Sequence, residues 1–403
     1  MKQAAVNPQK IEQWVNTRRD IHAHPELRYE ENRTADIVAK RLIELGYKVE
    51  TGLGVTGVVG TLQGRKTGRG ACIGLRADMD ALPIQEKNQF AHASRHPGKM
   101  HACGHDGHVA MLLGAAQELA ENPDFCGTVV LIFQPAEEGG AGAKRMIEDG
   151  LFDKYPVDAV FAMHNWPGLK EGEFAAHEGP VMASSNEFSI EIQAKGAHAA
   201  MPDLGTDPIV IAAQLITAFQ TIVSRNCKPV EPAVLSVTQI QAGEAINVIP
   251  NSATMQGTIR TFSIDTLDVM EAQFRKLTTE LCAAFGAKAE LKFERKYPPT
   301  INTIAMAQLA QRALQTIPEV SAVHNNLAPT MGAEDFAYML QHKPGAYLWI
   351  GNGEGGHRSH GHGIGPCTLH NPSYDFNDRI LPLGVKAWLA IVHTYLNEQS
   401  RDT

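Results

Sequence analysis

The sequence predicts an α/β protein with a central, mostly parallel sheet flanked by helices, interrupted by a second, smaller domain. Short continuous apolar runs, typical of strands buried on both faces, alternate with amphipathic helical patterns in the first part of the chain. From about residue 186 the strands instead alternate apolar and polar side chains, and the first style resumes after Tyr297. This change of pattern in mid-chain indicates an inserted domain.

Composition sets limits on the class of protein. The chain has 403 residues, 43% of them hydrophobic and 20% charged, which is typical of a globular protein of two or three domains. The net charge of -8 gives no basic surface for nucleic acid, and no continuous apolar run reaches the roughly 18 residues of a membrane span. We therefore expect neither nucleic acid nor membrane as a partner.

The compartment is indicated by the cysteines and the N-terminal residues. Six cysteines are scattered without paired spacing, which favours free thiols in a reducing compartment. The first residues lack the apolar core of a signal peptide. We expect a cytoplasmic protein.

Helices and strands alternate through the first part of the chain. Two helices are expected first, at about 11–21 and 34–45. His22 and His24 follow the first helix, and Pro25 favours a helix end and turn there over a metal site. The next elements are strands at 55–62, 71–76, 128–133 and 159–163, with helices at 109–119 and 143–149.

Polar side chains follow three of these strands. In open α/β sheets, ligands bind beyond the carboxyl ends of the strands. One parallel sheet would therefore bring these residues to one edge. This convergence favours a metal site over solvated surface turns. The residues in question are Asp78, Asp80, Glu137, Glu138 and His164.

The stretch Met100–His108 supplies further metal-ligand types. It holds three histidines, one cysteine and one aspartate, and it leads directly into the apolar helical pattern. Thiol and imidazole groups crowded in this way suit transition metals, with a polar loop around a buried cysteine as the alternative. Asp106 is expected to serve the start of the helix.

The inserted segment has its own order of elements. Its strands are expected at 187–195, 233–241, 253–262 and 287–296, and its helices at 207–225 and 265–285. The order βαββαβ is that of a ferredoxin-like sandwich. We expect residues 186–294 to form this domain, and residues 1–185 and 295–403 to form one discontinuous domain.

The last part of the chain again shows short apolar strand patterns between amphipathic helices. A helix at 303–316 and a strand at 346–350 precede a glycine-rich loop at 351–365, and a helix at 380–396 closes the chain. The loop contains three histidines, which could bind metal or gate access to the site. Its flexible, glycine-rich composition favours a simple loop or a gate. The histidines are His357, His360 and His362.

Six short motifs, in this order, carry a resemblance to a known family. They resemble those of the M20 metallopeptidases, and within them the N-acyl-amino-acid amidohydrolases that include hippurate hydrolases and plant auxin-conjugate hydrolases. The resemblance covers nearly the whole chain and implies a zinc-peptidase-like catalytic domain. The motifs are Arg76–Pro83, Cys103–Asp106, Gln134–Glu138, Met163–Asn165, Gly196–His198 and Leu369–Pro372.

The chain departs from the peptidase branch of that family. That branch has a His-x-Asp motif after the strand, and Asp78 takes the place of its histidine here. The place of the bridging aspartate is likewise taken by the Cys103–His105 stretch. Both departures favour the amidohydrolase subgroup.

The resemblance implies a site for two divalent metal ions per subunit. Imidazole, carboxylate and thiolate ligands suit Zn²⁺, Mn²⁺, Co²⁺ or Ni²⁺; the thiolate favours zinc, whereas the subgroup often uses manganese. His101 and His108 are left with supporting roles. The implied ligands are Cys103, His105, Glu138, His164 and His370.

The resemblance also implies catalytic and substrate-binding residues. Glu137 fits the general base, with ligation by both acids as the alternative, and Asp80 fits a residue that orients the metal ligands. His198 matches a histidine that completes the partner subunit's active site and stabilises an oxyanion. Asn247 and Arg260 match positions that bind the substrate carboxylate, although Arg260 could equally be an exposed strand residue.

We expect a metal-dependent amidohydrolase that cleaves N-acyl (aroyl or acetyl) amino acids and forms a homodimer through the inserted domain. The alternatives are an N-acetyl-diaminopimelate deacetylase or a metallo-dipeptidase. A non-catalytic metal-binding scaffold is disfavoured because Glu137 and all five implied ligands are present.

Overall fold

The computed structural model describes residues 7–67 and 70–399, and the chain divides into two compact units. The first unit comprises the described residues of Met1–Gly179, Ile301–Ala328 and Tyr338–Thr403. The second comprises Pro180–Thr300 and Pro329–Ala337.

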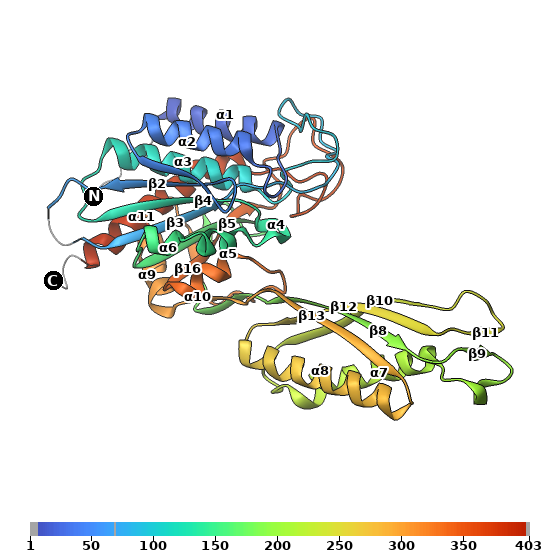
Figure 1. Cartoon of the computed structure of the whole chain (residues 1–403). Coiled ribbons are helices and arrows are strands. Elements are labelled where there is room, and N and C mark those ends of the chain that lie inside the picture. The colour runs from blue at the N-terminus through green and yellow to red at the C-terminus, as the bar shows by residue number, and fades with distance from the viewer. Residues whose placement is uncertain (1–6, 68–69, 400–403) are drawn as a thin grey trace. The chain divides into compact units, whose positions relative to one another are not determined.

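The first unit contains an eight-stranded sheet with the order β1-β2-β4-β3-β5-β16-β6-β15 (Figure 1). Its centre, β4-β3-β5-β16, is parallel, whereas β1, β2 and β6 add antiparallel pairings. The expected mostly parallel sheet is thereby confirmed. The strands are β1 (Lys48–Leu53), β2 (Gly57–Gln63), β3 (Cys72–Asp78), β4 (Thr128–Gln134), β5 (Ala159–Pro167), β6 (Glu173–Ala175), β15 (Ala322–His324) and β16 (Gly345–Gly353).

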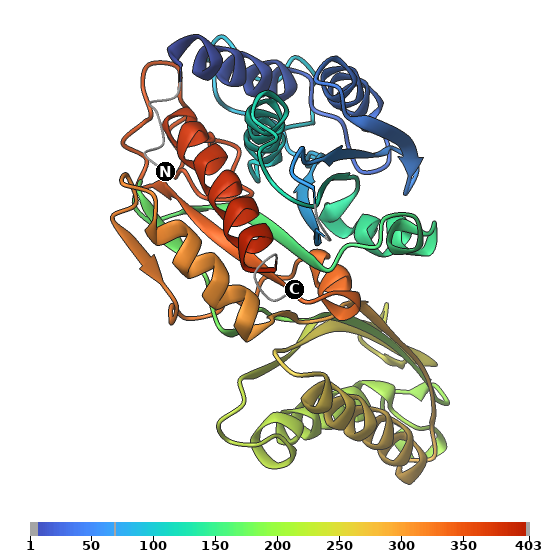
Figure 2. The ribbon, with the colours of Figure 1, turned by 90° about the vertical axis from the view of Figure 1, so that its left-hand side faces the viewer.

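Helices flank this sheet, as expected. One face packs against α1, α2, α3, α9 and α11 through one large apolar core. Figure 2 shows α11, the red helix, lying between α3 and α9. The helices are α1 (Pro8–Ala23), α2 (Asn32–Glu44), α3 (His105–Glu121), α4 (Glu137–Gly140), α5 (Gly142–Glu148), α6 (Leu151–Lys154), α9 (Ile304–Gln315), α10 (Phe336–His342), η3 (Asp378–Ile380) and α11 (Leu381–Gln399).

The second unit contains a four-stranded antiparallel sheet with the order β10-β12-β8-β13. Alternate residues of β8 are buried, and α7 and α8 cover that face. The expected βαββαβ order is confirmed. Its elements are β8 (Ser185–Gln193), β9 (Ala197–His198), η1 (Pro202–Leu204), α7 (Pro208–Thr221), η2 (Ile222–Asn226), β10 (Ala233–Ala242), β11 (Val248–Ile249), β12 (Ser252–Thr261), α8 (Ile264–Ala284) and β13 (Lys288–Tyr297). The short strands β7 (Gly179–Met182) and β14 (Thr300–Asn302) pair with each other and include residues of both units.

Among the described residues, one helical stretch is long and apolar enough by length and composition to cross a membrane: Pro208–Asn226. Ile211, Leu215 and Phe219 of this stretch pack in the core of the second unit. The other side of α7 exposes Ile209 and Val210. The stretch is therefore the core helix of a folded unit with an apolar outer side.

Candidate metal centre

Three parallel strands and one helix bring the candidate residues of the first unit together. Asp78 ends β3, Gln134 ends β4 just before Glu137, and His164 lies near the end of β5. These strands are neighbours in the order β4-β3-β5, so their carboxyl ends share one edge. The helix α3 begins at His105 beside this edge.

A first group consists of Cys103, His105 and His164. All three side chains are buried, and their ligand atoms lie within 4.8 Å of one another. The Cys103 Sγ atom lies 3.3 Å from Nε2 of His164. Sulfur and two imidazole nitrogens at this spacing match the ligands that zinc and other borderline metals prefer.

Backbone carbonyls orient both imidazoles of this group. Nδ1 of His105 donates to the Asp80 carbonyl at 2.8 Å, and Nδ1 of His164 donates to the Asn165 carbonyl at 2.6 Å. Each Nε2 lone pair is then directed into the group, as in metal sites whose ligands are held by a second hydrogen bond. Nε2 of His105 is buried without a hydrogen-bond partner among the described residues.

A second group consists of Cys103, Glu138 and His370, again within 4.8 Å. Nε2 of His370 lies 3.1 Å from the Glu138 carboxylate. The His370 backbone has φ of 62°, and its N–H donates to the Ala102 carbonyl at 2.7 Å. A non-glycine residue held in this left-handed conformation is typical of functional sites.

Asp80 fixes the turn that carries the two glutamates. Its carboxylate accepts the backbone N–H of Glu137 at 3.0 Å and that of Glu138 at 2.9 Å. The preceding Ala136 is left-handed, with φ of 55°. Glu137 is buried, and its carboxylate lies within 4.8 Å of a ring nitrogen of His105 and of the Glu138 carboxylate. The two acids are thus presented to the same centre from adjacent positions.

Burial and mutual charge shift the ionisation of these groups. Burial, with the nearby Glu138, raises the pKa of the Cys103 thiol, and burial lowers the pKa of His164. Burial alone would lower the pKa of His105, but Asp78 and Cys103 raise it well above its ordinary value. Contacts with Cys103 and Glu138 raise the pKa of His370 to about 10.

These side chains fit a cation. A buried thiol and two or more carboxylates in one place are unfavourable without positive charge, and a bound metal ion converts the thiol to a thiolate ligand. Nε2 of His105 lies 3.7 Å from Asp78 and makes no hydrogen bond within the described part of the chain, so it offers a metal-ligand atom in the same place. The residues present therefore suit divalent metal ions.

Sequence reasoning missed a hydrogen-bond network behind the centre. Nδ1 of His108 lies 2.6 Å from Asp78, and its Nε2 lies 2.8 Å from Oδ1 of Asn165. The Asn165 amide donates to the Tyr374 hydroxyl at 2.6 Å. Asn165 ends one of the six motifs and His108 ends the Met100–His108 stretch, so their identity was a signal, but nothing in the sequence indicated Tyr374 as a partner.

Asp106 has partners outside the helix whose start it was expected to serve. It lies in the first turn of α3, but its carboxylate contacts Arg18 at 3.3 Å and His22 at 2.9 Å. The residue before the helix is Gly104, which has no side chain with which to cap it. His22 ends α1 as expected, but it is buried and also contacts Glu86 at 3.2 Å.

Three predicted site residues lie in the second unit. His198 in β9 pairs with Val248 of β11, next to Asn247, and both His198 and Asn247 are exposed. Nδ1 of His198 accepts the N–H of Ala200 at 3.1 Å, so Nε2 is the protonated nitrogen. Arg260 is half-buried in β12.

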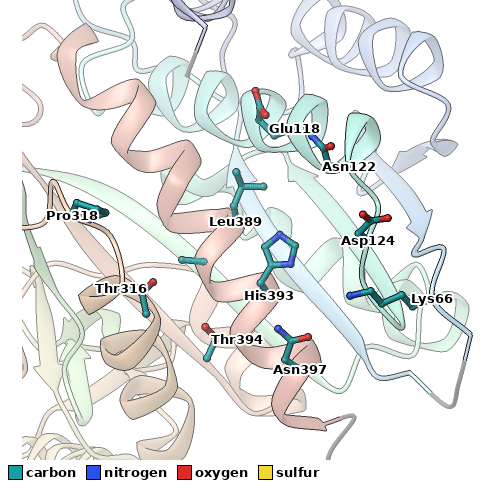
Figure 3. Close-up of a pocket in the computed structure, with 11 residues that line it drawn as sticks. Lys66, Glu118, Asn122, Asp124, Thr316, Pro318, Leu389, His393, Thr394 and Asn397 are labelled. Atoms are coloured by element: carbon teal, nitrogen blue, oxygen red, sulfur yellow. The ribbon is translucent and has the colours of Figure 1, made fainter. Parts of the chain in front are cut away.

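The glycine-rich loop and one surface cavity stand apart from the ligand groups. Nε2 of His362 lies 3.0 Å from Asp375, so this histidine is tied to the protein. A cavity of about 760 Å³ in the first unit includes Glu118, Asp124 and His393 in its lining (Figure 3). None of its lining residues belongs to the ligand groups.

Thiol, imidazole and carboxylate groups converge at the carboxyl edge of a mostly parallel α/β sheet. This arrangement is typical of metal-dependent hydrolases. The chain belongs to peptidase family M20/M25/M40, whose model matches residues 74–394. The resemblance of the six motifs is thereby confirmed.

Relatives cover most of the chain. An N-acetyl-L-cysteine deacetylase of Bacillus subtilis is 44% identical over 354 residues, 86% of this chain and 82% of the relative. A hippurate hydrolase of Campylobacter jejuni is 39% identical over 379 residues, 94% of this chain and 95% of the relative. A solved dinuclear metal-binding peptidase of the M20 family from Bacillus subtilis has a TM-score of 0.83 and 33% identity, covering 97% of this chain and 99% of that structure.

Proposed function

We propose that this chain is a metal-dependent amidohydrolase that cleaves the amide bond of N-acyl amino acids to a carboxylic acid and an amino acid. The observation that carries the proposal is the pair of ligand groups that share Cys103, with the buried Glu137 beside them. The relatives named as N-acetyl-L-cysteine deacetylase and hippurate hydrolase support an N-acyl amino acid as the substrate.

Two divalent ions per subunit fit the centre. Cys103, His105, Glu138, His164 and His370 would hold them, and Cys103 belongs to both ligand groups. The donor set favours Zn²⁺ or Mn²⁺, with Co²⁺ or Ni²⁺ also suited. When bound, such ions polarise a carbonyl and lower the pKa of water toward about 7.

Glu137 is the general base. Its carboxylate takes a proton from the attacking water and returns it to the amide nitrogen, so the amino acid leaves as an amine. Asp80 keeps this carboxylate in place by accepting the N–H groups of Glu137 and Glu138. General acid–base catalysis of this kind contributes about 10²- to 10⁴-fold to a rate.

The second unit supplies the remaining substrate contacts. The protonated Nε2 of His198 is a donor for the oxyanion of the tetrahedral intermediate. Arg260 and Asn247 bind the free carboxylate of the amino acid, because guanidinium groups bind carboxylates with two parallel hydrogen bonds. In the homodimer, we expect His198 to complete the active site of the partner subunit.

The chain forms a homodimer through the second unit and acts in the cytoplasm. The edge strand β10 and the outer side of α7 expose Ile240, Ile209 and Val210, which are 44–49% accessible. All six cysteines are free, as in a reducing compartment. Ile240→Lys should shift the dimer to monomer in light scattering, whereas Ile43→Lys, at a more exposed site on α2, should not.

Turnover on a substrate panel tests the function. The chelated enzyme is reloaded with Zn²⁺, Mn²⁺, Co²⁺ or Ni²⁺ and assayed on N-benzoylglycine, N-acetyl amino acids, N-acetyl-diaminopimelate and dipeptides. We expect hydrolysis of the N-acyl amino acids, loss on chelation and recovery with metal. Hydrolysis of dipeptides alone would assign the chain to the peptidase activity instead.

A further inference from the structure

A stack of aromatic rings lies beside the candidate metal centre in the first unit. Trp166 follows His164 on β5, and Trp349 lies opposite His164 on the neighbouring β16. The Trp166 and Trp349 rings are 4.0 Å apart and nearly parallel, at 8°. The Trp166 ring centroid is 6.2 Å from that of His164. One aromatic ring is thus placed next to a proposed metal ligand.

The stack is rigid on its inner side and open on its outer side. Trp349 is 2% exposed, and His177 packs edge-on against it, at 4.5 Å and 73°. Trp166 is partly exposed. Because its buried partner already fixes the plane of the ring, a ligand that stacks on Trp166 loses little by ordering it.

Packing alone does not explain the exposure of Trp166. The chain has four tryptophans, and the other three, Trp14, Trp349 and Trp388, are 4%, 2% and 1% exposed. Each of those three is part of the protein interior. Trp166 alone presents indole surface outward, at the carboxyl edge where substrate must arrive.

The chemistry of the indole ring selects between the two halves of an N-acyl amino acid. The face of an aromatic ring is electron-rich, so a free carboxylate is disfavoured above it. A flat aromatic acyl group stacks well, and such pairs contribute beyond the area that they bury. An acetyl group has no ring with which to stack.

We propose that Trp166, backed by Trp349 and His177, forms the acyl-group subsite and selects substrates with a planar aromatic acyl group, such as N-benzoyl amino acids. This inference rests on the proposed amide hydrolysis. It places the acyl half of the substrate against β5 and leaves the amino acid half for other contacts.

Two variants test the subsite by activity. Trp166→Leu keeps apolar volume but removes the flat ring, and Trp166→Phe keeps a flat ring. We expect Trp166→Leu to lower kcat/KM for N-benzoyl-alanine about 3- to 10-fold while N-acetyl-alanine changes less than about twofold. Trp166→Phe should recover most of the lost activity. Retained turnover of the acetyl substrate shows that the variant is folded.

A binding measurement provides a readout other than turnover. Titration of benzoate should quench the tryptophan fluorescence of the metal-loaded protein, whereas acetate should not. Trp166→Leu should lose the quenching, and the matched control Trp14→Phe should keep it, because Trp14 lies on α1 and contacts Gln117.

Several results would overturn the subsite. Equal loss on benzoyl and acetyl substrates would make Trp166 a structural residue. An effect that follows the amino acid side chain, at constant acyl group, would place the other half of the substrate there. If the wild-type protein hydrolyses neither substrate, the amidohydrolase function fails, and benzoate titration alone then decides whether the aromatic subsite exists.

Discussion

Two neighbouring glutamates at the centre differ in their surroundings. Glu138 approaches His370 at 3.1 Å and belongs to the group that includes Cys103, whereas Glu137 belongs only to groups without sulfur. Glu137→Gln preserves the shape of the side chain and removes the proton acceptor. We expect turnover to fall about 10²- to 10⁴-fold with unchanged metal content, measured by steady-state kinetics and elemental analysis.

The neighbouring substitution provides the matched control. Glu138→Gln replaces a proposed ligand, so metal content itself should fall along with activity. If Glu137→Gln loses metal as well, both acids are ligands and the base must be sought elsewhere.

The Cys103 thiol belongs to both candidate ligand groups. Burial raises the pKa of this thiol, so a bound cation is required to hold it as thiolate. Cys103→Ser replaces it with a hydroxyl that ionises far less readily. We expect a lower metal content per subunit after dialysis against buffer, by elemental analysis. Unchanged occupancy would remove Cys103 from the ligand set.

At the scale of elements, the start of α3 depends on one glycine. Gly104 has φ of 97°, and a Cβ there would lie 2.1 Å from Oδ1 of Asn165 and 2.6 Å from the Tyr374 hydroxyl. Gly104→Ala therefore combines backbone strain with a clash in the network behind the centre. We expect it to destabilise the first unit by about 2 kcal/mol or more, by denaturant titration followed through tryptophan fluorescence.

A second glycine separates the two effects. Gly46 also has positive φ, 84°, but a Cβ there would meet nothing within 4 Å. Gly46→Ala should therefore cost only the backbone strain, about 1 kcal/mol. An equal loss in both variants would show that the contact with Asn165 is unimportant.

The strands at the centre of the sheet could be predicted, but its margins could not. β3, β4 and β5 each contain a short apolar run and are buried along most of their length. β1 is an edge strand with mostly exposed or half-exposed residues, and β6 and β15 are only three residues long. Such strands carry no periodic apolar signal and form because a neighbour offers a partner.

The start of α3 shows a related limit. The apolar pattern predicted a helix from residue 109, but α3 begins at His105. Its first turn is buried although it is polar, because Asp106 pairs with Arg18 and His108 with Asp78. The order of strands along the chain was enough to predict that the motif residues meet at one edge of the sheet. The charge pairs behind that edge join residues 30 and 88 positions apart, which no local pattern reveals.

At the scale of the whole molecule, one buried cation ties distant segments of the first unit together. Arg18 on α1 contacts Asp106 on α3, Asp375 and Asp378, at 3.3, 3.0 and 2.7 Å. Arg18 and Asp106 are fully buried. Removing one partner of such a group leaves uncompensated charge in the interior, so this cluster makes the stability of the unit depend on ionisation.

His22, next to this cluster, gives a testable dependence of stability on pH. Burial alone would lower its pKa, but Asp106 and Glu86 raise it from 6.5 to about 10; His92 and His101 are its other titratable neighbours. The unfolded chain releases this proton near pH 6.5 and the folded chain only near pH 10, so the stabilisation is complete below pH 6.5 and is lost as pH rises through 10. We expect the free energy of unfolding of the wild-type unit to exceed that of His22→Gln by an amount that shrinks by up to about 1.4 kcal/mol per pH unit across this window.

All four tryptophans lie in the first unit, so denaturant titrations followed by their fluorescence at pH 6, 8 and 9.5 report on this unit alone. A difference between wild type and variant that stays constant with pH would mean that His22 is neutral in the folded protein.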